Sequence, residues 1–543
     1  MKLSGNIVDI KQRRIFPGTI TLKNNIIRSI EENSEQYDNY IMPGFINAHV
    51  HIESSMLAPA SFAHAVVKHG TVATVSDPHE IANVLGIEGI DFMIKNAKKA
   101  PLKIFFGAPS CVPATSFETA GAIIDSKDIN KLMQRDDIWY LSEMMNFPGV
   151  IFNDEEVHSK LKSSLKHNKP IDGHAPYLVG EDLIKYANAG ITTDHECVSI
   201  DEALQKIDLG IKVQIREGSA AKNFTALHSL LSQKPSMCML CTDDSHPDDL
   251  INGFMNLIVA RAVAEGHDVF DVLQAVSTNI IEHYKLPVGQ LQVGDSADFI
   301  IVNNLKEFKT QATYINGILV FDGEKTLFDI PTSKAINQFE RTKINLADLS
   351  QNLKKGDTIK IIEAYDGDLT TGVKKYSLEK NYENFESDLS SDILKIVVLS
   401  RYDQSKVQIA YINGFGMKEG AFASSIAHDS HNIIAVGTND SDLLESINLL
   451  INNKGGITFA NKNIQESLAL EIAGLMTNKS IDFVAKEYKK IDDLIKQTGS
   501  KLYAPLMTAA FMSLLVIPKL KLGDKGLFDV EKFTFTDLLT QRD

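Results

Sequence analysis

The sequence contains little of what stabilises exported proteins or anchors membrane proteins. Four cysteines among 543 residues are too few for a disulfide framework. No apolar run reaches the roughly 18 residues of a membrane span, and the N-terminus lacks the basic-then-apolar pattern of a secretory signal. Positive charge is in deficit, and the net charge of −15 argues against nucleic acids and anionic membranes as partners. We therefore expect a cytoplasmic protein.

Two of the cysteines, Cys238 and Cys241, have the spacing of a redox or zinc-binding pair. The residues around them, 237–240, are apolar and predict a buried strand. A cysteine in such a strand behaves as a small hydrophobic residue. We favour this structural interpretation over a redox or metal site.

Residues 41–285 alternate between short apolar runs and helix-length amphipathic segments. The expected strands are 45–50, 71–75, 103–106, 138–141, 170–172, 190–193, 212–215 and 237–240. An open doubly wound sheet shows the same alternation, but eight β-then-α units in a segment of this length are typical of a barrel. We therefore predict an α/β fold, a (β/α)₈ barrel of the TIM type.

The segments on both sides of this region have the character of a β-meander. Residues 3–31 contain short alternating stretches separated by turn residues, and similar stretches return at 289–302 and 312–322. We expect these flanks, residues 1–40 and 286–344, to pair as one discontinuous β-domain beside the barrel.

A polar stretch at 345–357 marks the start of a further domain, residues 345–543. Its predicted strands are 359–364, 393–399, 407–412 and 433–436. Its predicted helices are 441–452, 465–476 and 481–496. We expect an additional C-terminal domain of the α/β or α+β class.

The first predicted barrel strand ends in two histidines, His49 and His51. Residues i and i+2 of a strand point to the same face, so both imidazoles can reach one metal ion. A bare His-x-His motif is more often structural than metal-binding. The other strand ends decide between these interpretations.

Four later strand ends also carry residue types that ligate metals, where TIM barrels place their catalytic groups. They are Glu143, His174, His195 beside Glu196, and Asp243 beside Asp244. We predict two divalent ions, the first held by His49, His51 and Asp243 and the second by His174 and His195. Glu143 lies between the two sets and could bridge the ions with both carboxylate oxygens.

The run Pro-Gly-Phe-Ile-Asn-Ala-His-Val-His at 43–51, the later single histidines and the segment 289–298 resemble the amidohydrolase superfamily. Within it, the chain resembles the bacterial-type adenine deaminases. The stretches that carry this narrower resemblance are 51–56, 76–83, 142–146, 172–176, 194–196, 215–220, 242–244 and 425–432. They extend the resemblance over nearly the whole length of the chain. The resemblance implies hydrolytic deamination of adenine to hypoxanthine and ammonia.

The fourth barrel strand departs from the wider superfamily. Many binuclear members bridge their ions with a carboxylated lysine there, whereas this strand ends in Glu143. The resemblance to adenine deaminases implies a glutamate bridge. Histidine and carboxylate ligands suit Mn, Fe or Zn alike, and the resemblance favours Mn or Fe, with Zn as the alternative.

Such a deamination requires a hydroxide, a base and a proton donor near the ring nitrogen. Water held by divalent ions loses a proton near neutral pH. Asp243 is the candidate base, because it lies at a metal and faces that water. Glu217, Glu196 and Glu53 are candidate acids, and no spacing argument separates them.

Four further residues are candidates for binding the substrate, which we expect to be a free purine base. Arg216 and Ser219 follow the seventh strand and could bind the purine edge. His79 and Asp77 follow the second strand, where a substrate contact, support of the metal ligands and loop capping all fit. We also expect a homo-oligomer, a dimer or larger.

The C-terminal domain contains His428 and His431 on either side of Asp429. A further metal site and ordinary hydrogen bonding at a strand end both fit this spacing, and the second is commoner. The resemblance adds the hypothesis that this domain covers the active site as a lid.

Three other functions remain open from the sequence. Cyclic-amide hydrolysis of the dihydroorotase or hydantoinase kind shares every metal ligand, but those families usually carry the strand-four lysine. A cytidine-deaminase-type zinc site is imitated by His51, Glu53 and the cysteine pair, but proline is missing before Cys238 and the two halves lie far apart. A non-catalytic metal-binding barrel should have lost ligands, and none is missing here.

Overall fold

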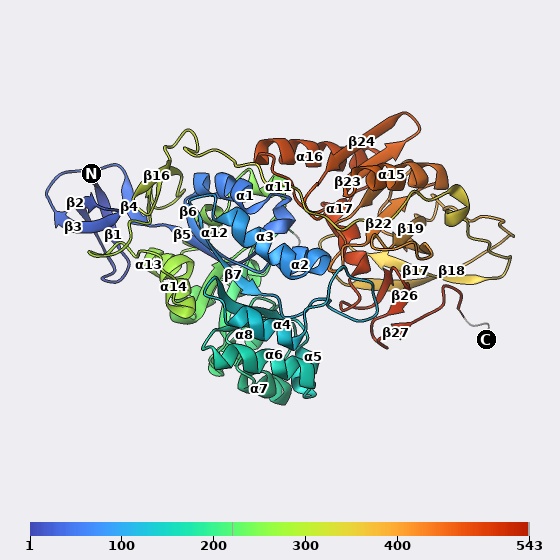
Figure 1. Ribbon diagram of the computed structural model, residues 1–543, viewed down its shortest axis with the longest axis horizontal. Helices are drawn as coiled ribbons and strands as arrows, with labels where there is room; N and C mark the ends of the chain where they lie inside the picture. The colour runs from blue at the N-terminus through green and yellow to red at the C-terminus, as the bar shows by residue number, and fades with distance from the viewer. Residues whose placement is uncertain (220, 541–543) are drawn as a thin grey trace.

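The computed structural model describes residues 1–219 and 221–540. Ala220, the last residue of the stretch 215–220, lies outside them, as do residues 541–543. Three parts follow one another along the long axis of the molecule (Figure 1): a sheet at the N-terminal end, a barrel, and a C-terminal domain at the other end. Among the described helices, none is long and apolar enough to cross a membrane.

Eight parallel strands form the barrel, and each overlaps one of the expected strands. They are β5 (Phe45–His51), β6 (Thr71–Ser76), β7 (Lys103–Ala108), β8 (Ile138–Met144), β9 (Ile171–Gly173), β10 (Thr193–Asp194), β11 (Lys212–Arg216) and β12 (Cys238–Cys241). Strands β5 to β9 pair in one set and β10 to β12 in another. The N–H of Thr192 donates to the carbonyl of Ile171 at 2.8 Å across one seam. At the other seam, the short β13 (Asp243–Asp244) pairs with β5.

The strands are buried on both faces because helices surround the barrel. Every residue of β5 and β6 is buried, as expected for parallel strands covered by helices. The surrounding helices are α1 (Pro59–Val66), α2 (His79–Leu85), α3 (Ile87–Ala97), α4 (Ser126–Met133), α5 (Phe147–Ile151), α6 (Glu155–Lys166), α7 (Gly180–Asn188), α8 (Ile200–Asp208), α9 (Phe224–Leu227), α10 (Leu230–Gln233), α11 (Pro247–Leu250), α12 (Met255–Ala264), α13 (Val269–Leu273) and α14 (Asn279–Tyr284). The predicted TIM-type barrel is therefore confirmed.

The two flanks of the barrel form one sheet of seven strands in the order β16-β15-β14-β4-β1-β2-β3. The strands are β1 (Lys2–Asp9), β2 (Arg14–Lys23), β3 (Ile26–Glu32), β4 (Tyr40–Pro43), β14 (Phe299–Val302), β15 (Thr310–Ile315) and β16 (Ile318–Phe321). Strand β4 joins the flanks, because it pairs with β1 on one side and with β14 on the other. This is the discontinuous sheet expected from the fold class. The domain boundaries after residues 40, 285 and 344 stay predictions.

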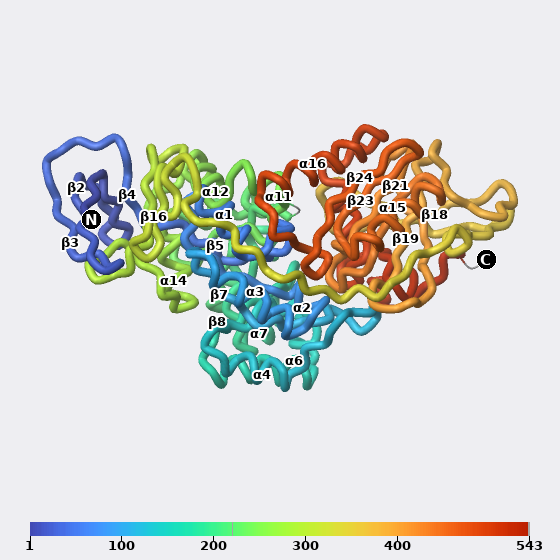
Figure 2. The backbone as a smooth tube through the Cα atoms, turned by 45° about the horizontal axis from the view of Figure 1, so that its top comes forward, coloured from blue at the N-terminus to red at the C-terminus, as the bar shows by residue number. Residues whose placement is uncertain are grey.

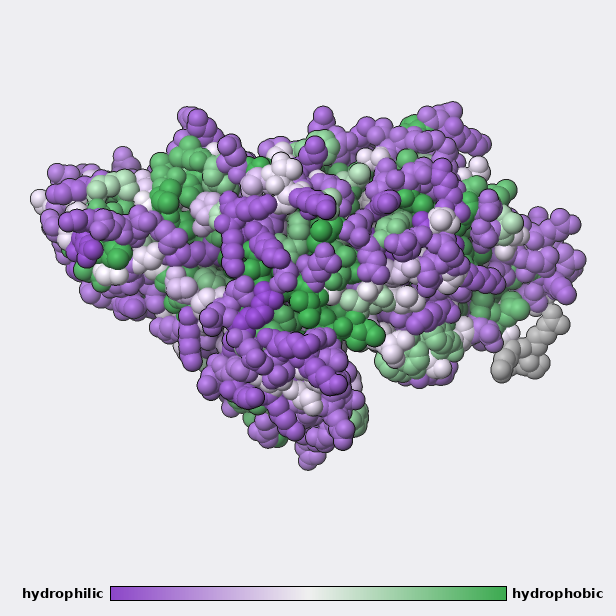
Figure 3. Space-filling view, in the orientation of Figure 1, coloured by the Kyte–Doolittle hydropathy of each residue, from purple (hydrophilic) through white to green (hydrophobic). Residues whose placement is uncertain are grey.

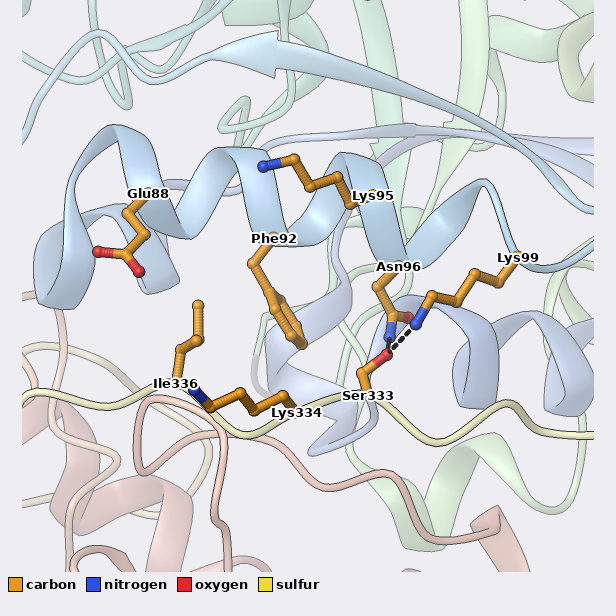
Figure 4. A pocket seen from close by; sticks show the side chains of 8 residues that line it. All are labelled: Glu88, Phe92, Lys95, Asn96, Lys99, Ser333, Lys334 and Ile336. Atoms are coloured by element: carbon orange, nitrogen blue, oxygen red, sulfur yellow. Dashed lines mark hydrogen bonds between the residues drawn. The ribbon is translucent and has the colours of Figure 1, made fainter.

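The segment after β16 crosses the barrel surface to reach the C-terminal domain, as the yellow part of the tube in Figure 2 shows. It is fastened to α3 at Ser333, whose hydroxyl accepts hydrogen bonds from Asn96 at 2.7 Å and Lys99 at 2.8 Å (Figure 4). Phe92 and Ile336 line the same surface groove. None of these residues lies at the strand ends that carry the candidate metal ligands.

The C-terminal domain is built on an eight-stranded mixed sheet in the order β18-β17-β20-β19-β22-β21-β23-β24. Its strands are β17 (Thr358–Ala364), β18 (Thr371–Ser377), β19 (Leu394–Leu399), β20 (Gln408–Asn413), β21 (Ala421–Ser424), β22 (Ile433–Gly437), β23 (Gly456–Asn461) and β24 (Ile464–Ala469). The helices are α15 (Asp440–Asn453), α16 (Ile481–Gln497) and α17 (Pro505–Ala510), followed by the small sheet of β25 (Leu520–Gly523), β26 (Gly526–Asp529) and β27 (Thr534–Phe535). Alternate residues of β19 face different layers: Val397 packs with α15, and Val398 belongs to the core that contains α16.

The prediction of a helix at 465–476 is wrong. This segment begins as β24 and pairs with β23 around a tight turn after Asn461. Its apolar residues Leu468, Leu470 and Ile472 recur at every second position, which is the period of a strand rather than of a helix. Pairing with a neighbouring strand therefore decided the local structure.

The barrel and the C-terminal domain are in contact. The long loop after β7 reaches across, where the N–H of Thr119 donates to Asp524 at 3.0 Å and Asn432 donates to the Thr119 carbonyl at 2.8 Å. The face shown in Figure 3 is mostly hydrophilic, and hydrophobic residues gather near α2, where the two parts meet. The C-terminal domain thus lies against the loops that follow the barrel strands.

Candidate active site

The candidate metal ligands meet at the carboxyl ends of the barrel strands. His49 and His51 both lie in β5 and are 0% and 3% exposed. Their Nε2 atoms are 3.1 Å apart, because alternation along the strand places both rings on the same face. His195 follows β10, and its ring stacks on that of His49 with centroids 4.2 Å apart. Three imidazoles from two strands therefore surround one point.

Glu143 at the end of β8 lies between two sets of histidines. Its Oε1 is 3.2 Å from Nε2 of His51 and 4.0 Å from Nε2 of His49. Its Oε2 is 2.6 Å from Nδ1 of His174 and 3.2 Å from Nε2 of His195. Burial raises the pKa of Glu143, but the combined lowering by His174 and the other imidazoles is larger. The pKa therefore lies well below its ordinary value. Each carboxylate oxygen thus faces a different histidine pair.

Asp243 reaches the same point from the opposite side of β5. Its Oδ1 lies 3.0 Å from Nε2 of His51 and 3.6 Å from Nε2 of His49. Its backbone φ of +58° is in the left-handed region, which is strained for a residue with a side chain. Strand pairing is interrupted at Thr242, and the chain turns there so that the carboxylate points at the histidines.

The donor set fits divalent transition metals. Ring nitrogens and carboxylate oxygens, the ligands that Mn, Fe and Zn accept, converge at short distances in a buried site. Groups of these side chains lie close enough to share an ion, for example His49, His195 and Asp243. A second group consists of Glu143, His174 and His195. A cation would also remove the repulsion between the two facing Nε2 atoms of His49 and His51.

Two family models match the chain. The Amidohydrolase family matches residues 40–320, and the Adenine deaminase C-terminal domain matches residues 368–534. A curated protein named "Adenine deaminase" from Methanosarcina mazei is 50% identical over 549 residues, with 99% of each chain covered. The protein of the same name from Borreliella burgdorferi is 50% identical over 544 residues, again with 99% of each chain covered.

The chain belongs to the adenine deaminase family. The relative from Salinibacter ruber is 45% identical, with 98% of each chain covered. Among solved structures, a beta-aspartyl dipeptidase from Fervidobacterium islandicum aligns with a TM-score of 0.46 at 14% identity, over 61% of this chain and 100% of that one. The amidohydrolase barrel and the additional C-terminal domain are both accounted for by the family.

The sequence analysis missed a buried lysine, Lys206. It holds the loops that carry the candidate ligands His174 and His195. Lys206 in α8 is 0% exposed, and its Nζ lies 3.1 Å from Asp194 and 2.7 Å from the Ala175 carbonyl. Asp194 in turn accepts the N–H of Ala175 at 3.0 Å. These contacts fix the residues next to His174 and His195. The signal in the sequence was a lysine on the apolar face of an amphipathic helix.

Asp77 and His79 lie inside the cluster of candidate ligands. The carbonyl of Asp77 is 3.1 Å from Nδ1 of His51. The Asp77 carboxylate accepts a hydrogen bond from Ser142 at 2.7 Å and lies 3.2 Å from Nδ1 of His79. That same nitrogen is 3.4 Å from Oε1 of Glu143. Both residues therefore support the candidate ligands from the second strand.

Arg216 is surrounded by protein carboxylates. Its Nη1 lies 2.5 Å from Glu196 and also contacts Asp243. Burial raises the pKa of Glu196, but Arg216, His174 and His195 together lower it by more, to about 2. Burial also raises the pKa of Asp243, but Arg216 together with His49 and His51 holds it well below its ordinary value. Glu196 is therefore ionised at neutral pH and holds no proton to donate.

The other two candidate acids have different surroundings. Glu217 is paired with Nη1 of Arg261 at 2.6 Å. Glu53 is buried in the 3₁₀ turn η1 (Ile52–Ser55), directly after His51, and accepts the N–H of Ile81 at 3.2 Å. Burial raises the pKa of Glu53 to about 7. The Glu53 carboxyl group is therefore partly protonated near neutral pH, whereas that of Glu196 is ionised.

Two other predicted residues lie farther from the histidines. Ser219 donates to Asp249 at 2.6 Å and lines a small cavity between the barrel and residues such as Tyr503 and Phe511 of the C-terminal domain. Cys238 is buried in β12, and burial raises its pKa to about 12. The cysteine thus behaves as a small buried hydrophobic residue, as the apolar strand predicts.

The C-terminal domain reaches the cluster through Glu80, to which the sequence analysis gave no role. Glu80 lies in the first turn of α2, and its Oε1 is 3.4 Å from Nε2 of His79 and 2.9 Å from Nδ1 of His428. Its Oε2 contacts Nε2 of His431. The two histidines expected at a strand end therefore lie beside the active site. Only the fold brings residues so distant in the chain together.

Proposed function

We propose that the chain catalyses the hydrolytic deamination of adenine to hypoxanthine and ammonia. The observation that carries this proposal is Glu143, whose two carboxylate oxygens face separate histidine pairs at the mouth of the barrel. The names of relatives that are about 50% identical over nearly their whole length supply the substrate.

We propose that two divalent ions complete the site. His49, His51 and Asp243 would hold one ion, His174 and His195 the other, and Glu143 would bridge them. Manganese or iron is our first choice and zinc the alternative, because the donor set has no thiolate that would select zinc. When bound, the ions lower the pKa of a water molecule and so supply hydroxide at neutral pH.

The remaining chemistry falls to the side chains. Asp243, kept ionised by Arg216, would accept the proton of the attacking water and pass it to the leaving amine. Glu53 would protonate the purine ring as C6 is attacked, since its raised pKa keeps a proton available. Ser219, His79 and Asp77 remain proposed contacts to the substrate or to the ligands.

Ammonia release from Mn-reconstituted protein tests this function. Adenine, adenosine, cytosine and dihydroorotate are offered in parallel, with and without a chelator. We expect turnover of adenine that the chelator abolishes and that added Mn or Fe restores. Ring opening of dihydroorotate without ammonia release would instead identify the protein as a cyclic-amide hydrolase. Metal binding without any turnover would favour a non-catalytic barrel.

We further propose a cytoplasmic location and assembly into a homo-oligomer. The four cysteines are free and buried, which suits a reducing compartment. Light scattering of the purified protein tests the assembly, because a mass equal to one 60.0 kDa chain would contradict it. Fractionation of the source cells tests the location.

A further inference from the structure

Glu80, His428 and His431 form a buried triad between the barrel and the C-terminal domain. The three residues are 2%, 5% and 1% exposed. Glu80 comes from the second barrel loop, and both histidines come from the loop after β21. The triad resembles a His₂Glu metal site in composition. Its hydrogen bonds, however, argue against a metal site.

The protonation of His431 rules out ligation by the ring nitrogen that faces Glu80. The N–H of Ala427 donates to Nδ1 of His431 at 3.3 Å. A backbone N–H is always a donor, so Nδ1 carries the lone pair and Nε2 carries the proton. That proton is donated to Glu80. Glu80 is therefore an ionised acceptor that orients the histidines, and the triad is a hydrogen-bonded clamp.

His428 is held by this clamp across the mouth of the barrel. Its Nδ1 faces Glu80, and its ring stacks on Phe511 with centroids 4.4 Å apart and planes 15° apart. Burial lowers the pKa of His428, but Glu80, with Asp244 and Asp429, raises it to about 9. Within residues 1–219 and 221–540, the carboxylate contacts of the His428 ring are made by Nδ1, with Glu80 and Asp429, and not by Nε2. The ring thus presents a charged N–H donor at Nε2.

Asp429, the next residue in the chain, supplies an acceptor. It is 4% exposed, and its Oδ2 has no hydrogen-bond partner in the described part of the chain. Its Oδ1 lies 3.9 Å from Nδ1 of His428. Glu80 links this loop to the candidate metal ligands, because its Oε1 lies 3.4 Å from Nε2 of His79, whose Nδ1 lies 3.4 Å from Oε1 of Glu143. A buried carboxyl oxygen without a partner is costly unless a ligand supplies the donor.

We propose that His428 and Asp429 bind the N3/N9 edge of the purine base. This inference rests on the proposed function and deepens it. A free purine presents a bare nitrogen at N3 and an N–H at N9 on the edge opposite C6. His428 would donate to N3 and Asp429 would accept from N9–H, while C6 faces the metal ligands. A nucleoside lacks the N9 proton, so this pair selects the free base over its ribosides.

Paired substrate analogues and variants test the proposal. The enzymes are wild type, Asp429→Ala, Asp429→Asn, His428→Ala and His428→Gln, and the control is Asp493→Ala, an exposed aspartate of α16. The compounds are adenine, 9-methyladenine, which lacks the N9 proton, and 3-deazaadenine, which lacks N3. Binding is measured by calorimetry and turnover by ammonia release. Metal content and thermal unfolding are measured for every variant.

We expect Asp429→Ala to weaken adenine binding and kcat/KM about 10- to 100-fold, the effect of one hydrogen bond to a charged group. Its 9-methyladenine values should stay unchanged, whereas Asp429→Asn should recover part of the loss. His428→Ala should likewise weaken adenine binding and leave the 3-deazaadenine values unchanged. His428→Gln should recover part of the loss on adenine. Metal content should equal that of wild type throughout.

Equal losses on all three compounds, or a loss of metal from either variant, would overturn the assignment, because both indicate a structural role. Calorimetry separates this result from the proposed function. A wild type that binds adenine selectively without releasing ammonia contradicts the deaminase proposal while the binding ratios still decide the edge contacts.

Discussion

Oε2 of Glu143 lies 2.6 Å from Nδ1 of His174, although the two residues come from neighbouring strands and are separated by a whole helical unit. The contact holds one carboxylate oxygen toward the fifth strand while the other remains on the side of the first. A neutral side chain of the same shape cannot serve both sides as an anion. The charge of Glu143 is therefore what the site depends on.

Glu143→Gln should lose most bound metal and nearly all deaminase activity while keeping the fold. The amide retains the volume of the carboxyl group but supplies a weaker oxygen ligand and no negative charge between the two sites. Metal content by plasma mass spectrometry and circular dichroism provide the measurements. Glu88→Gln, on the exposed face of α3, is the matched control. A fully metallated, active Glu143→Gln protein would falsify the site assignment.

The arrangement at the barrel strands could be predicted because it depends on local pattern. Strand alternation alone aims His49 and His51 at one point, and the position of Glu143 at a strand end brings it to the same face. The geometry distinguishes between candidate acids that spacing in the sequence could not separate. Glu196 and Glu53 look alike in the sequence, yet Arg216 and the nearby imidazoles lower the pKa of Glu196 to about 2 and burial raises that of Glu53 to about 7.

The side-chain contacts between the barrel and the C-terminal domain could not be predicted. Glu80 and His431 are 351 positions apart and meet only because the C-terminal domain lies on the barrel loops. The predicted helix 465–476 overlaps strand β24, Ile464–Ala469, whose partner follows from a turn and not from composition. Local periodicity predicts elements, whereas domain packing decides which polar residues meet.

Lys206→Met should destabilise the protein and weaken its metal affinity. The substitution leaves Asp194 and Glu202 buried without their cation, and breaking such a pair costs about 3–5 kcal/mol. Loss of the contact that positions the loops of His174 and His195 should lower metal affinity about 10- to 100-fold. Urea unfolding and metal titration measure the two effects. Lys185→Met, on the exposed side of α7, should change neither.

Glu53→Gln should reduce kcat at least about 100-fold, the usual contribution of a general acid. Glu217→Gln should remain within a few-fold of wild type, because Glu217 is engaged by Arg261. Initial rates of ammonia release at saturating adenine compare the two variants. A larger loss in Glu217→Gln than in Glu53→Gln would identify Glu217, after the seventh strand, as the proton donor.

Lys521→Met should remove a rise in stability between pH 7 and pH 10. Lys521 is 0% exposed and donates to the carbonyls of Leu369 at 2.8 Å and Phe511 at 2.9 Å. Burial lowers its pKa from 10.5 to about 7 in the folded protein. Between these values the unfolded chain binds a proton that the native state lacks, so the free energy of unfolding increases with pH by up to about 1.4 kcal/mol per unit.

The difference in unfolding free energy between wild type and Lys521→Met should therefore grow from pH 7 to pH 10 and level off below pH 7, where both states are protonated. Urea unfolding at a series of pH values measures this difference, in which other titrating groups cancel. Lys519→Met provides the control, since Lys519 is exposed and its charge is solvated in both states. A difference that does not change with pH would mean that Lys521 stays protonated in the native state, with its charge compensated by the two carbonyls.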